Sequence, residues 1–301
     1  MKKEKDYLKP YKKRRFFKPK EKKLNRSMAG NSLLFFVMAI CGVFMALPLV
    51  MIINNCLKPL DEIYQFPPKI FVRNPTLENF TDLFSIMSDS WVPFSRYIFN
   101  TVLISVAGTF GNLILASMAA YVLSKIKFPG RNIMFNLIVK SLMFHSTVGA
   151  ITSFLIMSRL HFVDTYWAVI VPAWGSTLGL YLMKQFMDSS VSDAVLESAR
   201  LDGASEFRTF FSIAMPMVKP AWLTMIVYSF QGLWNSGSSI YIYSEELKTF
   251  NYAIGQILAG GIVRAGAGAA STVVMMLVPI TVFVITQSNI IETMSSSGMK
   301  D

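Results

Sequence analysis

Six long apolar segments, separated by shorter polar stretches, dominate the pattern of this 301-residue chain. They lie near residues 31–53, 97–123, 132–158, 163–187, 217–240 and 271–291. Each approaches or exceeds the roughly 20 apolar residues that a helix needs to cross a bilayer. Because lipid offers the backbone no hydrogen-bond partners, a spanning segment must be a helix or part of a closed barrel, and these runs lack the alternation of barrel strands. The pattern predicts an all-α, polytopic membrane protein with six transmembrane helices.

Composition agrees with this pattern. Hydrophobic residues make up 53% of the chain and charged residues 16%, and the mean hydropathy is +0.44. A soluble domain of this composition would expose large apolar patches to water. The excess of apolar side chains therefore favours contact with lipid.

The net charge of +11 is concentrated near the N-terminus, where thirteen of the 29 Lys and Arg residues precede residue 27. Seven lie in segments expected on the opposite side of the membrane from this tail: Lys58, Lys69, Arg73, Arg96, Arg159, Lys248 and Arg264. Because Lys and Arg accumulate in cytoplasmic loops, we expect both termini and the polar loop 188–219 to face the cytoplasm. The tail is then a topogenic anchor, and no nucleic-acid partner is expected. It is also too long and polar for a typical cleaved signal, so we expect the first helix to be retained.

The segment 54–96, expected outside the cytoplasm, is rich in proline and aromatic residues and is long for a simple turn. Two interpretations stay open here. It forms a lip that contacts a delivery protein, or it packs against neighbouring loops.

Sequence motifs for enzymatic chemistry are missing from the chain. It has no G-x-x-x-x-G-K-[ST] loop and no Gly-Lys dipeptide, so it lacks the loop that holds ATP phosphates. Its histidines, His145 and His161, lack a nearby set of acidic or cysteine ligands. Cys41 and Cys56 are interpreted as small buried apolar side chains rather than a disulfide. We expect a non-enzymatic subunit with no metal and no cofactor of its own.

Polar side chains inside the apolar segments are functional candidates. Lys140 and His145 form either a proton relay or, as we favour, a snorkelling lysine and a histidine hydrogen-bonded inside the bundle. Three residues of the fifth segment with aromatic or amide side chains, Trp234, Asn235 and Tyr228, are candidates for a substrate pathway. Interfacial anchoring or core packing explains them equally well, and the same holds for two aromatic residues of the fourth segment, Trp174 and Tyr181.

The polar loop 188–219 has the features of a short helix that meets another protein. Ser190 or Ser192 is placed to cap a helix that has Asp193 in its first turn. Glu197 projects a carboxylate, and Gly203 permits a left-handed turn. A small, mostly apolar contact surface is expected from Ala194, Val195, Ala199 and Leu201.

Two further features of the loop bear on this interpretation. Pro216 prevents the loop from continuing as one rod into the next apolar segment. The alternative for Glu197 is a simple pair with Arg200 on a solvated helix.

The spacing of Glu197, Ala199, Gly203, Ile213 and Pro216 resembles the E-A-A, Gly, I-x-L-P signature in the coupling loop of bacterial ATP-binding-cassette (ABC) import permeases. The runs LDGAS at 201–205 and WN at 234–235, and the tail SSSGMKD, resemble the carbohydrate-importing branch of that family. The resemblance extends from about Tyr97 to the C-terminus. This chain departs from the usual pattern at four positions: Ser192, Ser198, Met215 and Ser236.

The resemblance implies a type I ABC importer permease fold in a bacterial cell membrane. It divides the chain into a basic tail (1–30), a first helix (31–53), the outer segment (54–96), a five-helix core (97–291) and a cytoplasmic end (292–301). It implies that the loop couples to an ATPase through Glu197, Ser198, Ala199, Asp202, Gly203, Ile213 and Pro216. The implied partners are a second permease subunit, two ATPase subunits that bind ATP and Mg, and an extracytoplasmic solute-binding protein.

Two other functions stay open. An ion-coupled secondary transporter would carry paired intramembrane acids or an inverted repeat, and beyond Lys140 and His145 the sequence shows neither. A membrane scaffold that transports nothing is the remaining possibility.

Overall fold

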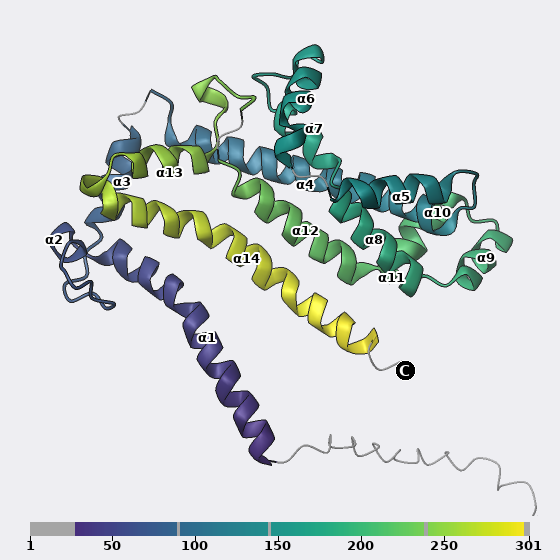
Figure 1. Cartoon of the computed structure of the whole chain (residues 1–301), viewed down its shortest axis with the longest axis horizontal. Helices are drawn as coiled ribbons and strands as arrows, with labels where there is room; N and C mark the ends of the chain where they lie inside the picture. Colours follow the sequence, from purple (N-terminus) through teal and green to yellow (C-terminus); the bar gives the residue numbers. More distant parts are fainter. Residues whose placement is uncertain (1–27, 89–90, 144–145, 238–239, 298–301) are drawn as a thin grey trace, which may run out of the picture. The chain divides into compact units, whose positions relative to one another are not determined.

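A computed structural model describes residues 28–88, 91–143, 146–237 and 240–297, and over these ranges the chain is helical without strands. The basic tail, His145 and the last four residues lie outside the described part. The chain divides into two units, residues 1–48 and 49–301, each considered by itself. The first described helix, α1 (Met28–Leu57), begins in the first unit and ends in the second (Figure 1).

The second unit contains the remaining helices. In chain order they are α2 (Leu60–Ile63), α3 (Glu78–Ser88), α4 (Phe94–Lys125), α5 (Arg131–Ser141), α6 (Ser146–Arg159), α7 (Trp167–Trp174), α8 (Thr177–Ser190), α9 (Asp193–Leu201), α10 (Glu206–Thr209), the π-helix η1 (Phe210–Ala214), α11 (Met215–Met217), α12 (Lys219–Trp234), the 3₁₀ turns η2 (Glu245–Leu247) and η3 (Ile262–Arg264), α13 (Phe250–Ala259) and α14 (Ala265–Ser297).

Three stretches of the described chain are long and apolar enough to cross a membrane as single helices: Gly30–Leu57, Phe94–Lys125 and Ala265–Gln287. A fourth candidate is a pair, Glu206–Met217 and Lys219–Trp234, bent by 83°. The predicted count of six is therefore not confirmed. The third and fourth predicted segments are each divided between two shorter helices, α5 with α6 and α7 with α8.

The break between α7 and α8 has a local cause. Pro172 lies within the last turn of α7, and the helix ends before Gly175. Ser176 then starts α8 afresh, because its side chain accepts a hydrogen bond from the backbone N–H of Gly179 at 3.3 Å. One apolar run thus becomes two helices.

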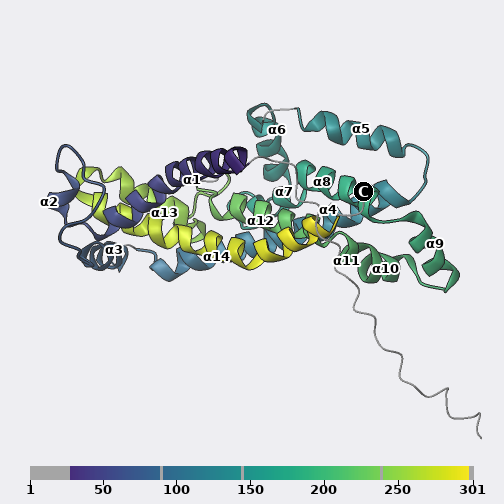
Figure 2. The ribbon, with the colours of Figure 1, turned by 90° about the horizontal axis from the view of Figure 1, so that it is seen from below.

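Helix α4 packs against α7, α8 and α12, and α12 lies between α4 and α14 (Figures 1 and 2). Small residues permit this close packing. A Cβ at Gly111 would lie 2.0 Å from Nε1 of Trp174, whose indole N–H donates to the carbonyl of Ala107 at 3.1 Å. Polar side chains are also buried along α4, and Asn112 donates to Ser229 of α12 at 3.1 Å.

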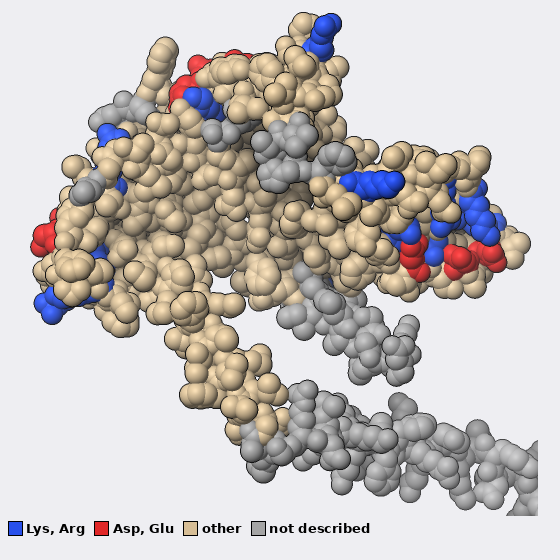
Figure 3. Space-filling view, in the orientation of Figure 1, with Lys and Arg blue, Asp and Glu red and all other residues tan. Residues whose placement is uncertain are grey.

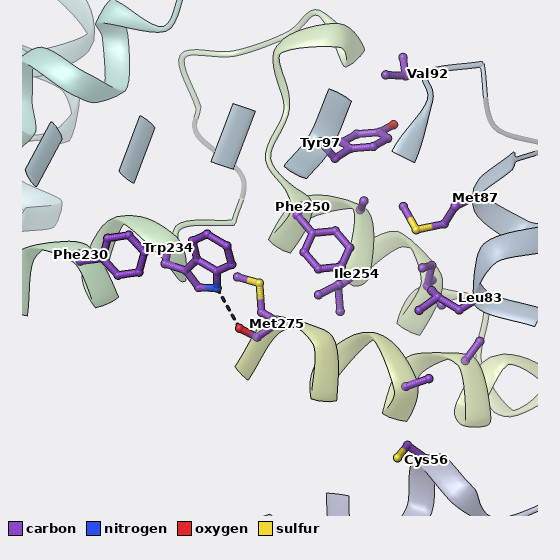
Figure 4. Close-up of a cluster of buried hydrophobic side chains, with 14 residues drawn as sticks. Cys56, Leu83, Met87, Val92, Tyr97, Phe230, Trp234, Phe250, Ile254 and Met275 are labelled. Atoms are coloured by element: carbon purple, nitrogen blue, oxygen red, sulfur yellow. Dashed lines mark hydrogen bonds between the residues drawn. The ribbon is translucent and has the colours of Figure 1, made fainter. Parts of the chain in front are cut away.

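Two clusters of buried apolar side chains hold the second unit together. The Phe250 cluster joins α3, α12, α13 and α14, and Figure 4 shows Trp234 of α12 directed at Met275 of α14. The Leu196 cluster joins α4, α8, α9, η1 and α12, and includes Tyr121, Met183 and Phe210.

The outer segment 54–96 is folded back on neighbouring elements. Asn79 is buried and donates to the carbonyls of Cys56 and Lys58 at 2.9 and 2.7 Å. Leu83 and Met87 of α3 lie in the Phe250 cluster. These contacts support the packing interpretation of this segment, while contact with a delivery protein stays a prediction.

Candidate functional site

The start of α9 is held by a lysine from another helix. Ser192 occupies the N-cap position but makes no side-chain cap, and Ser190 is the last residue of α8, so the predicted serine cap is wrong. Instead Nζ of Lys125, at the end of α4, donates to the carbonyl of Val191 at 2.6 Å and to Asp193 at 2.9 Å. Lys125 thereby links the end of α8 to the first residue of α9.

The Asp193 carboxylate lies among positive charges. The hydrogen bond from Lys125 and then its charge lower the pKa of Asp193, with smaller contributions from Lys127 and Arg131. The Asp193 side chain is 78% exposed, whereas that of Lys125 is 6% exposed. Solvent therefore weakens the ion pair, and the protected bond from Lys125 to Val191 is the firmer contact.

The end of α9 is a Schellman motif. The N–H of Gly203 donates to the carbonyl of Arg200 and that of Ala204 to the carbonyl of Ala199, both at 3.0 Å. Gly203 has φ +80°, which confirms the predicted left-handed turn. Ser205 then begins α10 by accepting the backbone N–H of Arg208 at 3.4 Å. The connection between α9 and α10 is thus four residues long.

The two faces of α9 differ. Leu196 and Ala199 are buried in the second unit, so the prediction that Ala199 belongs to the exposed contact surface is wrong. Glu197, Ser198 and Asp202 are exposed, and Leu201 is 89% exposed. Helix α9 thus turns one face into the second unit and presents a mixed polar and apolar face outward.

Three hydrogen-bonded side chains, Arg200, Glu206 and Tyr121, form a charged link that joins α9, α10 and α4. Nε of Arg200 lies 2.7 Å from Oε1 of Glu206, and the hydroxyl of Tyr121 donates to Oε2 of Glu206 at 2.9 Å. The hydrogen bond that Arg200 donates to Glu206 raises the pKa of Arg200, which keeps its positive charge. Arg200 thus pairs with Glu206, and the alternative pair with Glu197 is not what the structure shows.

A groove of about 450 Å³ lies over this link. It is lined by Lys125, Ile126, Lys127, Asp193, Leu196, Glu197, Arg200 and Glu206. Figure 3 shows basic and acidic side chains gathered at this end of the second unit, over α9 and α10. Both signs of charge meet here, so the surface suits a protein partner with charges of its own.

Beyond the groove the chain bends sharply. The π-helix η1 and α11 lead to Val218, where the axis turns by 83° into α12. Pro216 and Pro220 lack the N–H needed for a continuous helix, and the indole N–H of Trp222 donates to the carbonyl of Met215 across the bend at 3.1 Å. Ile213 is half-buried and Pro216 is exposed.

Comparison with known proteins identifies the family. Residues 112–295 match the family described as "binding-protein-dependent transport system inner membrane component". That match covers more than half of the chain, and it contains α9, the bend and α12. The chain belongs to this family.

Several known bacterial proteins are similar to the chain. Protein LplC of Bacillus subtilis is 31% identical over 68% of the chain and 67% of its own length. The arabinooligosaccharides transport system permease protein AraQ of the same organism is 28% identical over 89% of the chain and 94% of its own length. The sn-glycerol-3-phosphate transport system permease protein UgpE of Yersinia enterocolitica is 27% identical over 77% and 81%.

Solved structures show the same fold. The chain is similar, with a TM-score of 0.74 and 20% identity, to a chain of a bacterial ABC transporter involved in the import of the acidic polysaccharide alginate. The match covers 87% of this chain and 98% of that one. The fold is thus that of an ABC importer chain.

The predicted substrate-pathway residues lie in two environments. Trp234 is buried, stacks on Phe230 and donates to the carbonyl of Met275 at 2.9 Å. Asn235 and Tyr228 are exposed. Core packing accounts for Trp234, and a role of the three residues in a substrate pathway stays a prediction.

The other candidates from the sequence are dispersed. Trp174 packs against α4, and Tyr181 stacks on Phe135 with ring centroids 6.1 Å apart. Lys140 is exposed near the end of α5, and its proposed partner His145 lies outside the described residues. Among the described residues no group of three metal-binding side chains comes together.

Sequence reasoning missed Tyr121, Lys125 and Glu206. The only local signal was the i,i+4 spacing of Tyr121 and Lys125 at the end of an apolar run, which places them on one face of α4. That spacing does not reveal partners 66 to 85 residues further along the chain.

Proposed function

We propose that the chain is the permease subunit of an ATP-driven importer that carries a sugar or oligosaccharide across a bacterial cell membrane. The observation that carries the proposal is α9 with the left-handed turn that follows it: Glu197 is exposed and lines a charged groove, Leu201 is exposed, and both lie within a match to the transport family. Two relatives are consistent with a carbohydrate substrate, one named for arabinooligosaccharides and one importing alginate.

The importer is assembled from several subunits. A second permease subunit pairs with this chain, and two ATPase subunits bind ATP and Mg. One ATPase subunit docks at α9 through Glu197, Ser198, Asp202 and Gly203. A solute-binding protein delivers the substrate outside, as supported by the fold shared with an alginate importer solved together with its periplasmic protein (TM-score 0.59).

The membrane arrangement follows from the charges. The strongly basic N-terminus and the loop 188–219 face the cytoplasm. The broken pairs α5 with α6 and α7 with α8, together with the bent pair through α12, complete six crossings. Non-helical backbone at these breaks is tolerated where neighbouring helices cover it.

The test is uptake into vesicles that contain the full complex. Uptake of a labelled oligosaccharide is expected with internal ATP and no ion gradient, and a non-hydrolysable nucleotide is expected to abolish it. Uptake driven by an ion gradient without ATP would instead show a secondary transporter, and the proposal would fail.

Docking at α9 is tested with Glu197→Lys. The reversed charge is expected to release the ATPase subunits during co-purification, while membrane insertion is retained. Asp82→Lys is the matched control, because it makes the same charge change on the exposed face of α3. Equal recovery of ATPase subunits with both variants would overturn the docking assignment.

A further inference from the structure

Helix α4 is an uninterrupted rod between the two ends of the second unit. It runs for 32 residues without an internal proline, a length of about 48 Å at 1.5 Å per residue. Its two ends hold segments that are far apart in sequence: α9 at one end and residues 245–250 at the other.

At the α9 end, two side chains of α4 form hydrogen bonds with residues before and after α9. Tyr121 and Lys125 are one turn apart on the same face. Lys125 holds the start of α9 through Val191 and Asp193, and Tyr121 holds the turn after α9 through Glu206. Between them Leu196, 1% exposed, packs into the cluster that contains Tyr121. A displacement of α9 therefore pulls on the last turn of α4.

At the other end, one turn of α4 holds the segment 245–250. Asn100 is fully buried, and its Nδ2 donates to the carbonyls of Glu246 and Lys248, both at 2.8 Å. The N–H of Phe250 donates to Oγ1 of Thr101 at 2.8 Å. Tyr166 of the loop before α7 donates to Oδ1 of Asn100 at 2.7 Å. These buried contacts fix two loops to the rod.

The other helices that leave the α9 region are interrupted. The path through α12 crosses the 83° bend at Val218, and the path through α8 meets the break at Ser176. A bend or break absorbs a displacement because its backbone torsions change locally. Helix α4 lacks such a joint.

We propose that α4 is the element that carries movement of α9 to the segment 245–250, and that Tyr121, Arg200 and Glu206 are the positioning residues that attach α9 to it. This inference rests on the proposed function, since it concerns how ATPase-driven movement reaches the far side. It adds a route and three residues to that function. Because α9 and residues 245–250 are both attached to the rigid helix α4, a movement at one of these sites reaches the other through that helix.

The first experiment measures hydrogen exchange of the full complex with and without a non-hydrolysable nucleotide. In the wild-type complex, exchange is expected to change in α9 and in residues 245–250. In Tyr121→Phe and Glu206→Gln the change in exchange of α9 is expected to persist, while the change in residues 245–250 is expected to be lost. Tyr243→Phe is the matched control, because its ring is largely exposed, and it is expected to keep both changes.

The second experiment reverses the ion pair. Arg200→Glu and Glu206→Arg are each expected to lower the sugar transported per ATP hydrolysed, and the double reversal is expected to restore it. The ratio of sugar transported to ATP hydrolysed separates a positioning role from a simple loss of folded protein, and restoration separates it from direct contact of Arg200 with the ATPase.

Opposite results overturn the inference. It fails if residues 245–250 respond to nucleotide equally in wild type and in both link variants, or if the double reversal is no better than the single ones. Wild-type ATP-dependent uptake, measured in the same vesicles, reports separately on the proposed function.

Discussion

Gly203 shows how a single backbone angle shapes the α9 surface. It adopts φ +80°, and a Cβ at this position would meet no atom within 4 Å. The cost of Gly203→Ala is therefore conformational, about 1–2 kcal/mol of unfolding free energy. A fall in the thermal unfolding temperature of the purified protein is the expected result.

Gly232 supplies the control for this measurement. It lies in α12 with ordinary helical φ, and a Cβ there also meets no atom within 4 Å. Gly232→Ala is expected to be neutral or to stabilise by up to about 1 kcal/mol. Equal destabilisation by both substitutions would contradict the backbone explanation.

The Lys125 and Asp193 side chains are expected to contribute unequally to the free energy of unfolding. Lys125→Met leaves the Val191 carbonyl without its charged donor, and we expect a loss of about 1–2 kcal/mol. Asp193→Asn removes a largely exposed partner and is expected to cost less than about 1 kcal/mol. Chemical denaturation of the two variants in one detergent compares them directly, and a larger loss for Asp193→Asn would reverse the ranking.

The Asp193 contribution also depends on pH. Its pKa is lower in the folded protein than its ordinary value of 3.8, so its contribution is fully present above that value and is lost as pH falls through the folded pKa. The stability difference between wild type and Asp193→Asn is therefore expected at pH 6 and is expected to shrink as the pH falls below 3.8. A difference that grows on acidification would contradict the assigned ion pair.

At the level of elements, the bend at Val218 depends on prolines and on one indole. Trp222→Phe keeps an aromatic ring but removes the donor to the Met215 carbonyl, and is expected to cost about 1 kcal/mol. Trp91→Phe is the control, since Trp91 is 96% exposed. Equal unfolding temperatures for the two variants would show that the hydrogen bond does not hold the bend.

Helix boundaries were predictable only where a residue with a special backbone marks them. Pro216 and Gly203 each signalled a break or a turn, and the structure has a bend just after Pro216 and a left-handed turn at Gly203. The division of the third segment into α5 and α6 had no such signal, because apolar side chains suit a continuous helix and an interrupted one alike. Hydropathy therefore gave the apolar stretches correctly but not the number of single helices.

At the level of the whole molecule, two aromatic residues of α12 differ in their surroundings. Trp234 packs against α14, whereas Tyr228 is exposed. Trp234→Phe removes the bond to Met275 and is expected to lower stability by about 1 kcal/mol without changing the KM of uptake. Tyr228→Ala, at a side chain 55% exposed, is expected to leave the unfolding temperature unchanged. A changed KM of uptake for Trp234→Phe, with an unchanged unfolding temperature, would instead support a role of Trp234 in the substrate pathway.

Only those features of the candidate site that depend on residues close in the sequence could be predicted. The α9 helix, the exposed Glu197 and the Gly203 turn follow from short-range spacing, because turn chemistry acts within a few residues. The start of α9 does not, since Lys125 holds it in place of the predicted serine cap. The inward face of Ala199 and the contacts of Tyr121 and Glu206 depend on tertiary packing. Tyr121 and Glu206 are 85 residues apart, and a polar side chain beside an apolar run has many partners open to it.

The two cysteines differ in accessibility, which has a practical consequence. Cys41 is exposed on α1, whereas Cys56 is buried and its Sγ donates to the carbonyl of Ile53 at 3.1 Å. Because these are the two thiols of the chain and a thiol in apolar surroundings stays protonated and unreactive, neither cysteine should react with a maleimide while Cys41 lies in the bilayer. A single cysteine introduced in a water-exposed loop of the otherwise native chain is then expected to be the position that a fluorophore labels.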